Sequence, residues 1–175
     1  MFFPLSFIMA AEKPTGVKVF GILQIIFSAF TIFAKGFAMS ISFALIAFLS
    51  VGLPEGGIPL FLQQANIPQS MFYFFAGYTI LFNVIYWALG WLGLIASIGV
   101  LMTKNWARKM LIGVAISILS LNIIAIIIGF AIGQYTSALA IILALVWFAF
   151  KAVYYGWLIA YFNKIKIQRI FTPTK

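Results

Sequence analysis

The stretch from Met71 to Met102 contains no charged side chain, and apolar residues dominate it. A helix that crosses the hydrocarbon core of a bilayer needs about 20 mainly apolar residues. A water-soluble domain carries roughly 25% charged residues, because it must present a wetted surface around its core. In this chain of 175 residues, 7% are charged and 65% are hydrophobic. The sequence therefore predicts an integral membrane protein whose main solvent is lipid.

Three further apolar segments flank this stretch, and Pro, Gly, polar or basic residues bound them. Together they predict four membrane-spanning helices, over residues 17–35, 74–102, 110–133 and 138–162. The region 36–73 holds a second apolar run, 37–53, followed by a loop with several Pro and Gly residues. The run 37–53 can extend the first helix, lie at the interface or re-enter the membrane. We expect one all-α transmembrane domain over residues 1–175, folded as a four-helix bundle.

With four spans, most basic residues fall on one side of the membrane. That side carries nine of the eleven basic residues: Lys13, Lys18, Lys104, Arg108, Lys109, Lys164, Lys166, Arg169 and Lys175. Because Lys and Arg mark cytoplasmic segments, we expect both termini in the cytoplasm and a multi-pass protein of the cell membrane. The other side has Lys35. A fifth span at 37–53 would move the turn at residues 104–109 to that side, so four spans fit the charges better.

The first two predicted helices are long for a membrane. If the first continues through Lys35, it reaches roughly 54 Å, and a helix from Ser70 to Thr103 reaches roughly 50 Å. The hydrocarbon core is only about 30 Å thick, and tilt absorbs part of any excess. One hypothesis is an apolar hairpin that projects beyond the outer face and binds a partner. Steep tilt or a thick membrane is the alternative.

The turn at residues 104–109 has the composition of a membrane interface. Trp106 is an amphipathic aromatic residue of the kind that lies at headgroup level. We expect Lys104, Arg108 and Lys109 to contact anionic headgroups. We therefore attribute the net charge of +9 to membrane topology and to contacts with lipid headgroups. We expect membrane lipids, and no nucleic acid, as partners.

Small residues in the spans predict close helix packing. Helices in lipid associate through close backbone approach and a few polar contacts, because apolar side chains gain little by leaving lipid for a helix interface. The residues expected to pack are Gly90, Gly93 and Gly99 in the second span, and the pairs Gly113 with Ser117 and Gly129 with Gly133 in the third.

Lys151 is the strongest candidate for a functional residue, because ionisable side chains inside a membrane are costly. It precedes Lys164 by 13 residues, or about 20 Å along a helix. Lys151 can bind an anion or lipid headgroup, pair with an acid of a partner subunit, or extend its stem toward the inner interface. Asn83, Asn122 and Gln24 lie within spans, where each can hydrogen-bond between helices. Asn83 and Asn122 can also complete a polar site with Lys151.

The sequence offers little material for catalysis. It contains no Cys and no His, and its two acids, Glu12 and Glu55, lie outside the predicted spans. Thiolate chemistry, imidazole metal sites and carboxylate relays cannot be built from such a set. We therefore expect no catalytic residue, no metal, no cofactor and no enzymatic activity.

Two short motifs resemble those of a group of membrane proteins. Lys13–Val17 (Lys-Pro-Thr-Gly-Val) precedes the first span, and Lys104–Arg108 (Lys-Asn-Trp-Ala-Arg) joins the second and third spans. Both are similar to segments of small uncharacterised four-span integral membrane proteins of bacteria and archaea, which have a Lys-Pro-x-Gly-Val start and a Lys-x-Trp-Ala-Arg turn. The resemblance implies a tetraspan fold with cytoplasmic ends. It implies no known activity and assigns no catalytic residue.

Three functions fit these observations. The first is an accessory or structural subunit of a larger membrane protein complex, which agrees with the lack of chemistry and with a Lys151 that has no internal counter-ion. The second is a self-associating membrane scaffold. The third is a small channel or transporter with a polar path through Asn83, Asn122 and Lys151. We expect the first, with other integral membrane subunits or copies of the same chain as partners.

Overall fold

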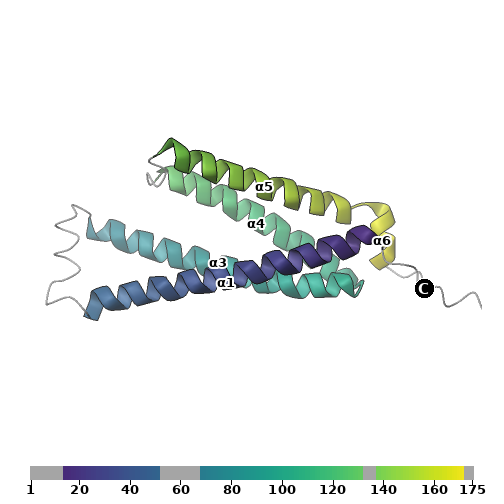
Figure 1. Ribbon diagram of the computed structural model, residues 1–175, viewed down its shortest axis with the longest axis horizontal. Helices are drawn as coiled ribbons and strands as arrows, with labels where there is room; N and C mark the ends of the chain where they lie inside the picture. Colours follow the sequence, from purple (N-terminus) through teal and green to yellow (C-terminus); the bar gives the residue numbers. More distant parts are fainter. Residues whose placement is uncertain (1–13, 52–67, 132–136, 172–175) are drawn as a thin grey trace, which may run out of the picture.

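The computed structural model describes residues 14–51, 68–131 and 137–171, and in these residues the chain is helical without a strand. The helices are α1 (Thr15–Val51), α3 (Gln69–Leu101), α4 (Asn105–Ala131), α5 (Ala138–Phe162) and α6 (Ile165–Phe171) (Figure 1). By length and composition, the first four of these are apolar enough to cross a membrane. The prediction of an all-α chain with four candidate spans is confirmed, and this is the architecture of a multi-pass membrane protein.

The observed bounds refine the predicted spans. α1 is continuous from Thr15 to Val51, so the apolar run after Lys35 extends the first helix as far as the structure describes it. α5 covers residues 138–162, as predicted. α4 begins at Asn105, five residues before its predicted start. The predicted loop over residues 54–68 lies, apart from Pro68, outside the described residues, and so does the predicted end of the third span.

A turn of three residues, Met102–Lys104, joins α3 to α4. The Lys104 N–H donates to the Gly99 carbonyl oxygen at 2.9 Å, and the Thr103 N–H donates to the Val100 carbonyl oxygen at 2.9 Å. These two bonds form a Schellman closure of α3. Thr103 has a φ of 58°, in the left-handed region that Gly usually occupies at this position. The short turn explains why α4 starts earlier than the sequence predicts.

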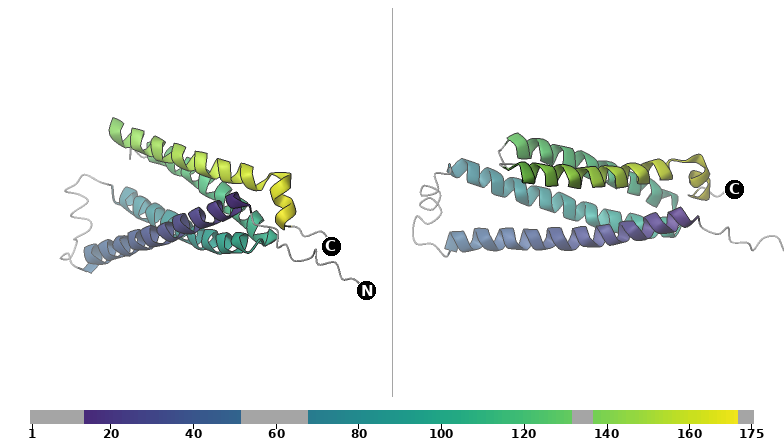
Figure 2. Two further views of the ribbon diagram at one scale, coloured as in Figure 1. Left: turned by 45° about the vertical axis from the view of Figure 1, so that its right-hand side comes forward. Right: turned by 45° about the horizontal axis from the view of Figure 1, so that its top comes forward.

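The four long helices form a sequential series of contacts: α1 packs along α3, α3 against α4, and α4 against α5. In Figure 1, α1 and α5 lie in front of α3 and α4. The views in Figure 2 show that α1 and α5 diverge from each other away from α6. Aromatic side chains connect them nearer to α6, where the Phe20 ring lies 5.0 Å from that of Tyr161 and the Phe27 ring 4.8 Å from that of Tyr154.

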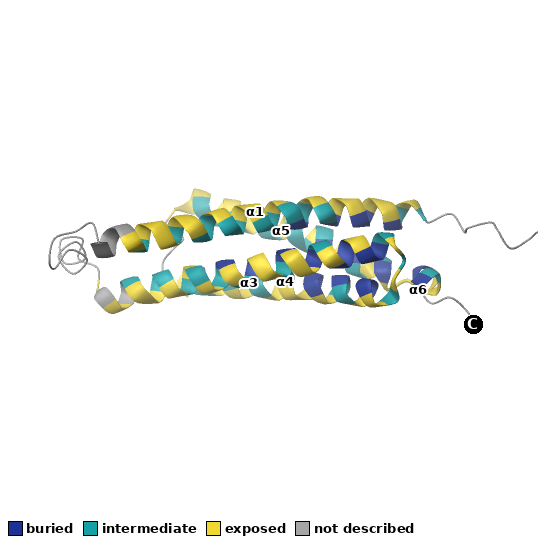
Figure 3. Cartoon of the chain, turned by 90° about the horizontal axis from the view of Figure 1, so that it is seen from below, coloured by how far each residue is buried: buried dark blue, intermediate teal, exposed yellow. Residues whose placement is uncertain are grey.

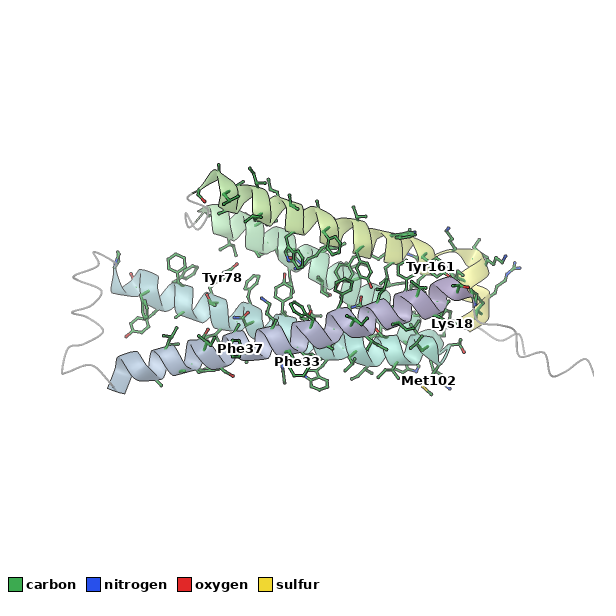
Figure 4. The ribbon with its side chains drawn as sticks, in the orientation of Figure 1. Lys18, Phe33, Phe37, Tyr78, Met102 and Tyr161 are labelled. Atoms are coloured by element: carbon green, nitrogen blue, oxygen red, sulfur yellow. The ribbon has the colours of Figure 1, made fainter. Side chains whose placement is uncertain are left out.

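The densest packing lies at the end of the molecule where α6 crosses it (Figure 3). Side chains with less than 2% exposure come there from four helices: Val17, Val100, Leu111, Leu158 and Phe162. α6 buries Ile167 and Phe171 against this end. Figure 4 shows Lys18, Met102 and Tyr161 at the same end.

We call this end the basic end, because it carries the described basic residues that the charge pattern assigns to one side. These are Lys18, Lys104, Arg108, Lys109, Lys164, Lys166 and Arg169. Lys13 and Lys175 lie outside the described residues. The helix directions therefore agree with the predicted grouping of basic residues, since α1 and α4 start at this end while α3 and α5 finish there.

Two glycines of α3 allow α1 to approach closely. A Cβ atom at Gly90 would lie 2.9 Å from Ile32 Cγ1 and 3.4 Å from the Ile32 backbone nitrogen. A Cβ atom at Gly93 would lie 2.6 Å from Ser28 Oγ. The prediction that the glycines of the second span serve helix packing is confirmed at both positions.

The corresponding prediction for Gly113 and Ser117 is wrong. Both residues are exposed, and a Cβ atom at Gly113 would meet no neighbour within 4 Å. Gly129 is buried, and its predicted partner Gly133 lies outside the described residues. The opposite face of α4 packs instead, through Leu111, Val114, Ala115 and Ile118. The four-residue spacing correctly places Gly113 and Ser117 on one face of α4. That face does not contact another helix.

The long helices share the basic end, so their difference in length lies at the opposite end. α1 has 37 residues and α5 has 25, a difference of 12 residues or about 18 Å along a helix. α3, with 33 residues, exceeds α5 by 8. Figure 1 shows α1 and α3 extending beyond α4 and α5. We call residues 40–51 of α1 and 69–76 of α3 the projecting arms.

Candidate functional site

A cleft of about 400 Å³ lies between α1 and α5. α1 lines it with one face of residues 26–35, and α5 lines it with residues from 147 to 155. Tyr86 of α3 and Ile118 of α4 also line it. Most of its wall is aliphatic or aromatic, but two basic side chains, Lys35 and Lys151, reach it from opposite helices. We call this the lysine cleft.

Helix direction explains why the two lysines converge. Lys35 is 20 residues after Thr15, or about 30 Å from the basic end, while Lys151 is 11 residues before Phe162, or about 17 Å from it. Side chains in a helix lean toward its N-terminus. Because α1 starts at the basic end and α5 finishes there, Lys35 leans toward the basic end and Lys151 leans away from it. The two amines therefore meet at an intermediate level.

Lys151 is held by a neutral amide. Its Nζ donates a hydrogen bond to Asn122 Oδ1 at 2.9 Å. Asn122 Nδ2 in turn donates to the Ile118 carbonyl oxygen, one turn earlier in α4, at 2.6 Å. This second bond fixes which side of the amide faces Lys151, so Asn122 presents its acceptor oxygen to that amine, although Asn122 itself does not line the cleft.

Aromatic rings surround both amines. Lys35 Nζ lies 5.2 Å from the ring centroid of Tyr86, and Lys151 Nζ lies 5.7 Å from the same centroid. Lys151 Nζ also lies 5.3 Å from the Trp147 ring centroid. Cations within about 6 Å of a ring face are attracted to its electrons. Tyr86 therefore contacts both cations and partly stabilises each of them.

The described residues provide no carboxylate to balance these cations. The two acids of the chain, Glu12 and Glu55, both lie outside them. Since both amines lie within 6 Å of the Tyr86 centroid, they are at most about 11 Å apart. Two unit charges at that separation repel by at least about 1.5 kcal/mol at an effective dielectric of about 20. In the described part of the chain, the cleft thus has an excess of positive charge.

The structure brings two of the three predicted polar residues together. Lys151 lines the cleft and forms a hydrogen bond with Asn122, which lies beside the cleft. Asn83 is 7% exposed and lies on α3, one turn before Tyr86, but it does not line the cleft. The direction of Lys151 also differs from the predicted alternative in which its stem extends toward the inner interface, because the side chain leans away from the basic end.

Sequence reasoning missed Lys35 as a site residue and assigned it to the outer side. Because its charged side chain interrupts an apolar run, Lys35 resembles the end of a span. The available signal was that apolar residues continue without a break on both sides of Lys35, which predicts a position within a long helix.

Gln24 connects helices, as the sequence predicts. It is 1% exposed, and its Oε1 accepts a hydrogen bond from the Tyr154 hydroxyl of α5 at 3.1 Å. Gln24 Nε2 donates to Ser28 Oγ at 3.3 Å within α1. This polar contact joins α1 to α5 on the basic-end side of the lysine cleft.

The residues expected at the headgroups divide into two groups. Lys104, Trp106 and Lys109 are exposed at the basic end, where they are available to lipid headgroups. Arg108 is 8% exposed, and its Nη1 donates to the carbonyl oxygen of Phe162 at 3.0 Å. Arg108 thus joins the start of α4 to the end of α5, a contact that the sequence did not indicate.

The projecting arms form a second candidate surface. A cavity of about 270 Å³ lies between them, lined mainly by Ser42, Leu45, Ile46, Phe72, Phe75, Ala76 and Thr79. Phe43 and Phe74 are 53% and 58% exposed. The arms are therefore apolar, loosely packed and uncovered by α4 and α5.

No family model, curated protein or solved structure matches the chain. The resemblance of Lys13–Val17 and Lys104–Arg108 to small four-span membrane proteins stays a prediction.

Proposed function

We propose that the chain is an accessory or structural subunit of a larger membrane protein complex, without catalytic chemistry of its own. The projecting arms of α1 and α3 carry this proposal. They are the surface through which the chain binds other integral membrane subunits. The scarcity of acids and the lack of Cys and His in the sequence agree with a role in assembly.

The length of α1 is the main support for a partner. At 37 residues it measures about 55 Å, whereas the hydrocarbon core is about 30 Å thick. Fitting α1 into that core would need a tilt of more than 50°, beyond the 0–40° range of membrane helices. α5, at about 37 Å, needs a tilt of about 37°, which lies within that range. The arms therefore extend past the level that α5 can span, and an apolar partner covers them there.

Replacing Phe74 by Asn tests this proposal. Phe74 is an exposed aromatic residue of the α3 arm, and aromatic anchors often dominate an interface. We expect Phe74→Asn to reduce co-purification of the partner subunits at least about tenfold, equivalent to about 1.4 kcal/mol. The measurement is mass analysis of particles solubilised gently from membranes that carry each variant.

Phe74→Leu is the matched control, since it keeps an apolar side chain at the same position. We expect its particles to have wild-type composition. A Phe74→Asn particle that keeps all its foreign subunits would refute a role for this arm. A particle built only from copies of this chain would support the scaffold function instead.

We further propose that the basic end faces the cytoplasm and that the protein resides in the cell membrane. The grouping of seven described basic residues at this end supports the orientation, because Lys and Arg are retained on the cytoplasmic side. Residues 137 and 166 then lie on opposite sides of the membrane.

Cysteine labelling tests the orientation with little background, because the wild-type chain contains no Cys. In intact cells, we expect a membrane-impermeant maleimide to label Ser137→Cys, at the start of α5, but not Lys166→Cys, in α6. Lysis should expose Lys166→Cys to the reagent. Labelling of Lys166→Cys alone in intact cells would reverse the proposed orientation.

A further inference from the structure

We propose that the lysine cleft binds one membrane amphiphile, with an oxyanion head held between Lys35 and Lys151 and an apolar chain along the aromatic wall. The head is a carboxylate or a phosphate ester. The lysine cleft is a different part of the molecule from the projecting arms, so this proposal and the proposed subunit function are tested independently.

The charges in the cleft favour an anionic head. Two ammonium groups reach the cleft, and the described residues supply only a neutral amide and aromatic rings as their partners. A single oxyanion between them would accept a charge-assisted hydrogen bond from each amine and would remove their mutual repulsion. Asn122 is already engaged as an acceptor for Lys151, so it helps to position this amine toward the head.

The shape and lining of the cleft favour an apolar chain attached to this head. Its volume of about 400 Å³ lies within the range of roughly 300–1,000 Å³ that is typical of small-molecule sites. Apart from the two lysines, its lining is mainly aliphatic and aromatic, including Phe27, Phe30 and Phe150. A small inorganic anion would leave this apolar surface unused. An anion attached to an apolar chain would contact both parts of the wall.

The position of the cleft gives an amphiphile access from the bilayer. The cleft lies between α1 and α5, the two helices at the ends of the contact series α1–α3–α4–α5. Phe27 of α1 contacts Phe150 and Tyr154 of α5, and away from α6 the two helices diverge (Figure 2). The cleft therefore opens between α1 and α5, and in a membrane that opening faces lipid. An amphiphile can enter sideways from the bilayer without crossing the basic end, where the four helices are most densely packed (Figure 3).

Depth distinguishes the two sources of the head. Lys151 lies about 17 Å along α5 from the basic end and about 20 Å from the other end of the helix. A carboxylic acid can reach this level in its neutral, protonated form, whereas a phosphodiester keeps its charge. We therefore expect a long-chain carboxylate to enter the cleft more readily than an anionic phospholipid.

Native mass spectrometry of the purified, delipidated full chain in neutral detergent tests the proposal. The probes are oleate, oleyl alcohol, which has the same chain without the charge, and phosphatidylglycerol. We expect one oleate per chain, bound at least tenfold more tightly than oleyl alcohol. Lys35→Met and Lys151→Met should each weaken oleate binding about tenfold or more, because each removes one charged partner. The double variant should bind oleate and oleyl alcohol equally.

Lys164→Met is the control, since Lys164 is exposed at the basic end, and it should bind oleate as the wild type does. Preferential binding of phosphatidylglycerol that is lost in the double variant would support the site and assign the phosphate ester as the head. Equal binding of oleate and oleyl alcohol to the wild type would overturn the proposal, whatever the stability of the variants. Oleate binding that survives in the double variant would overturn it as well.

Discussion

Replacing Gly90 by Leu should lower the free energy of unfolding by about 3 kcal/mol. A Cβ atom at this position would already lie 2.9 Å from Ile32 Cγ1 and 3.4 Å from the backbone of α1. A Leu side chain adds three more carbon atoms to a contact that has no room for them, and such overpacking typically costs 1–3 kcal/mol or more. Because the neighbouring atoms include backbone, α1 and α3 must separate. Unfolding in SDS mixed micelles, followed by tryptophan fluorescence, measures the change.

Gly77→Leu is the matched control in the same helix. A Cβ atom at Gly77 would meet no atom within 4 Å. Leu is the better helix former by roughly 1 kcal/mol or less, so this variant should be as stable as the wild type or slightly more stable. Equal destabilisation by both substitutions would contradict the close α1–α3 contact.

Replacing Arg108 by Met should cost about 2–3 kcal/mol of stability. Arg108 Nη1 donates to the Phe162 carbonyl oxygen at 3.0 Å, and both residues are buried. Hydrogen bonds to charged groups contribute roughly 1.5–3 kcal/mol, and their loss leaves a buried carbonyl without this donor. The end of α5 and α6 should therefore loosen. Hydrogen exchange over residues 159–171, together with the unfolding free energy, measures both effects.

Lys109→Met is the neighbouring control for Arg108. Lys109 also belongs to the first turns of α4, but its side chain is exposed, so its removal should change stability by less than about 0.5 kcal/mol. If Arg108→Met matched this small change, Arg108 would act only at the headgroups, as the sequence first suggested.

The spans and their grouping of charge could be predicted from the sequence because lipid imposes strict requirements. Apolar length fixed residues 138–162 as a helix, and the structure gives the same bounds for α5. The position of Lys and Arg then favoured four spans over five, and the residues that the structure describes contain four candidate spans. These features depend on composition along the chain and not on which side chains meet.

The features that could not be predicted from the sequence depend on contacts between helices. Gly90 and Gly113 look alike in sequence, yet only Gly90 faces another backbone. The early start of α4 depends on Thr103, a β-branched residue in a conformation that usually requires Gly. Lys35 interrupts the apolar pattern and so resembled a boundary, although the helix continues past it. The seven residues of α6 are too few for their periodicity to be distinctive.

The lysine cleft combines both cases. Lys151 could be selected from the sequence because an ionisable residue deep in an apolar span is unusual. Its meeting with Lys35 depends on the opposite directions of α1 and α5 and on the level of each residue. The position of each lysine along its helix can be calculated from the sequence. That the two side chains meet becomes evident only once α1 is known to continue past Lys35.

The most direct test of the subunit function is the composition of the native particle that contains the wild-type chain. Native membranes are solubilised gently, and the mass and subunits of the purified particle are determined. Our account predicts foreign integral membrane subunits in a fixed ratio to this chain. A particle that contains only this chain and lipid would contradict it.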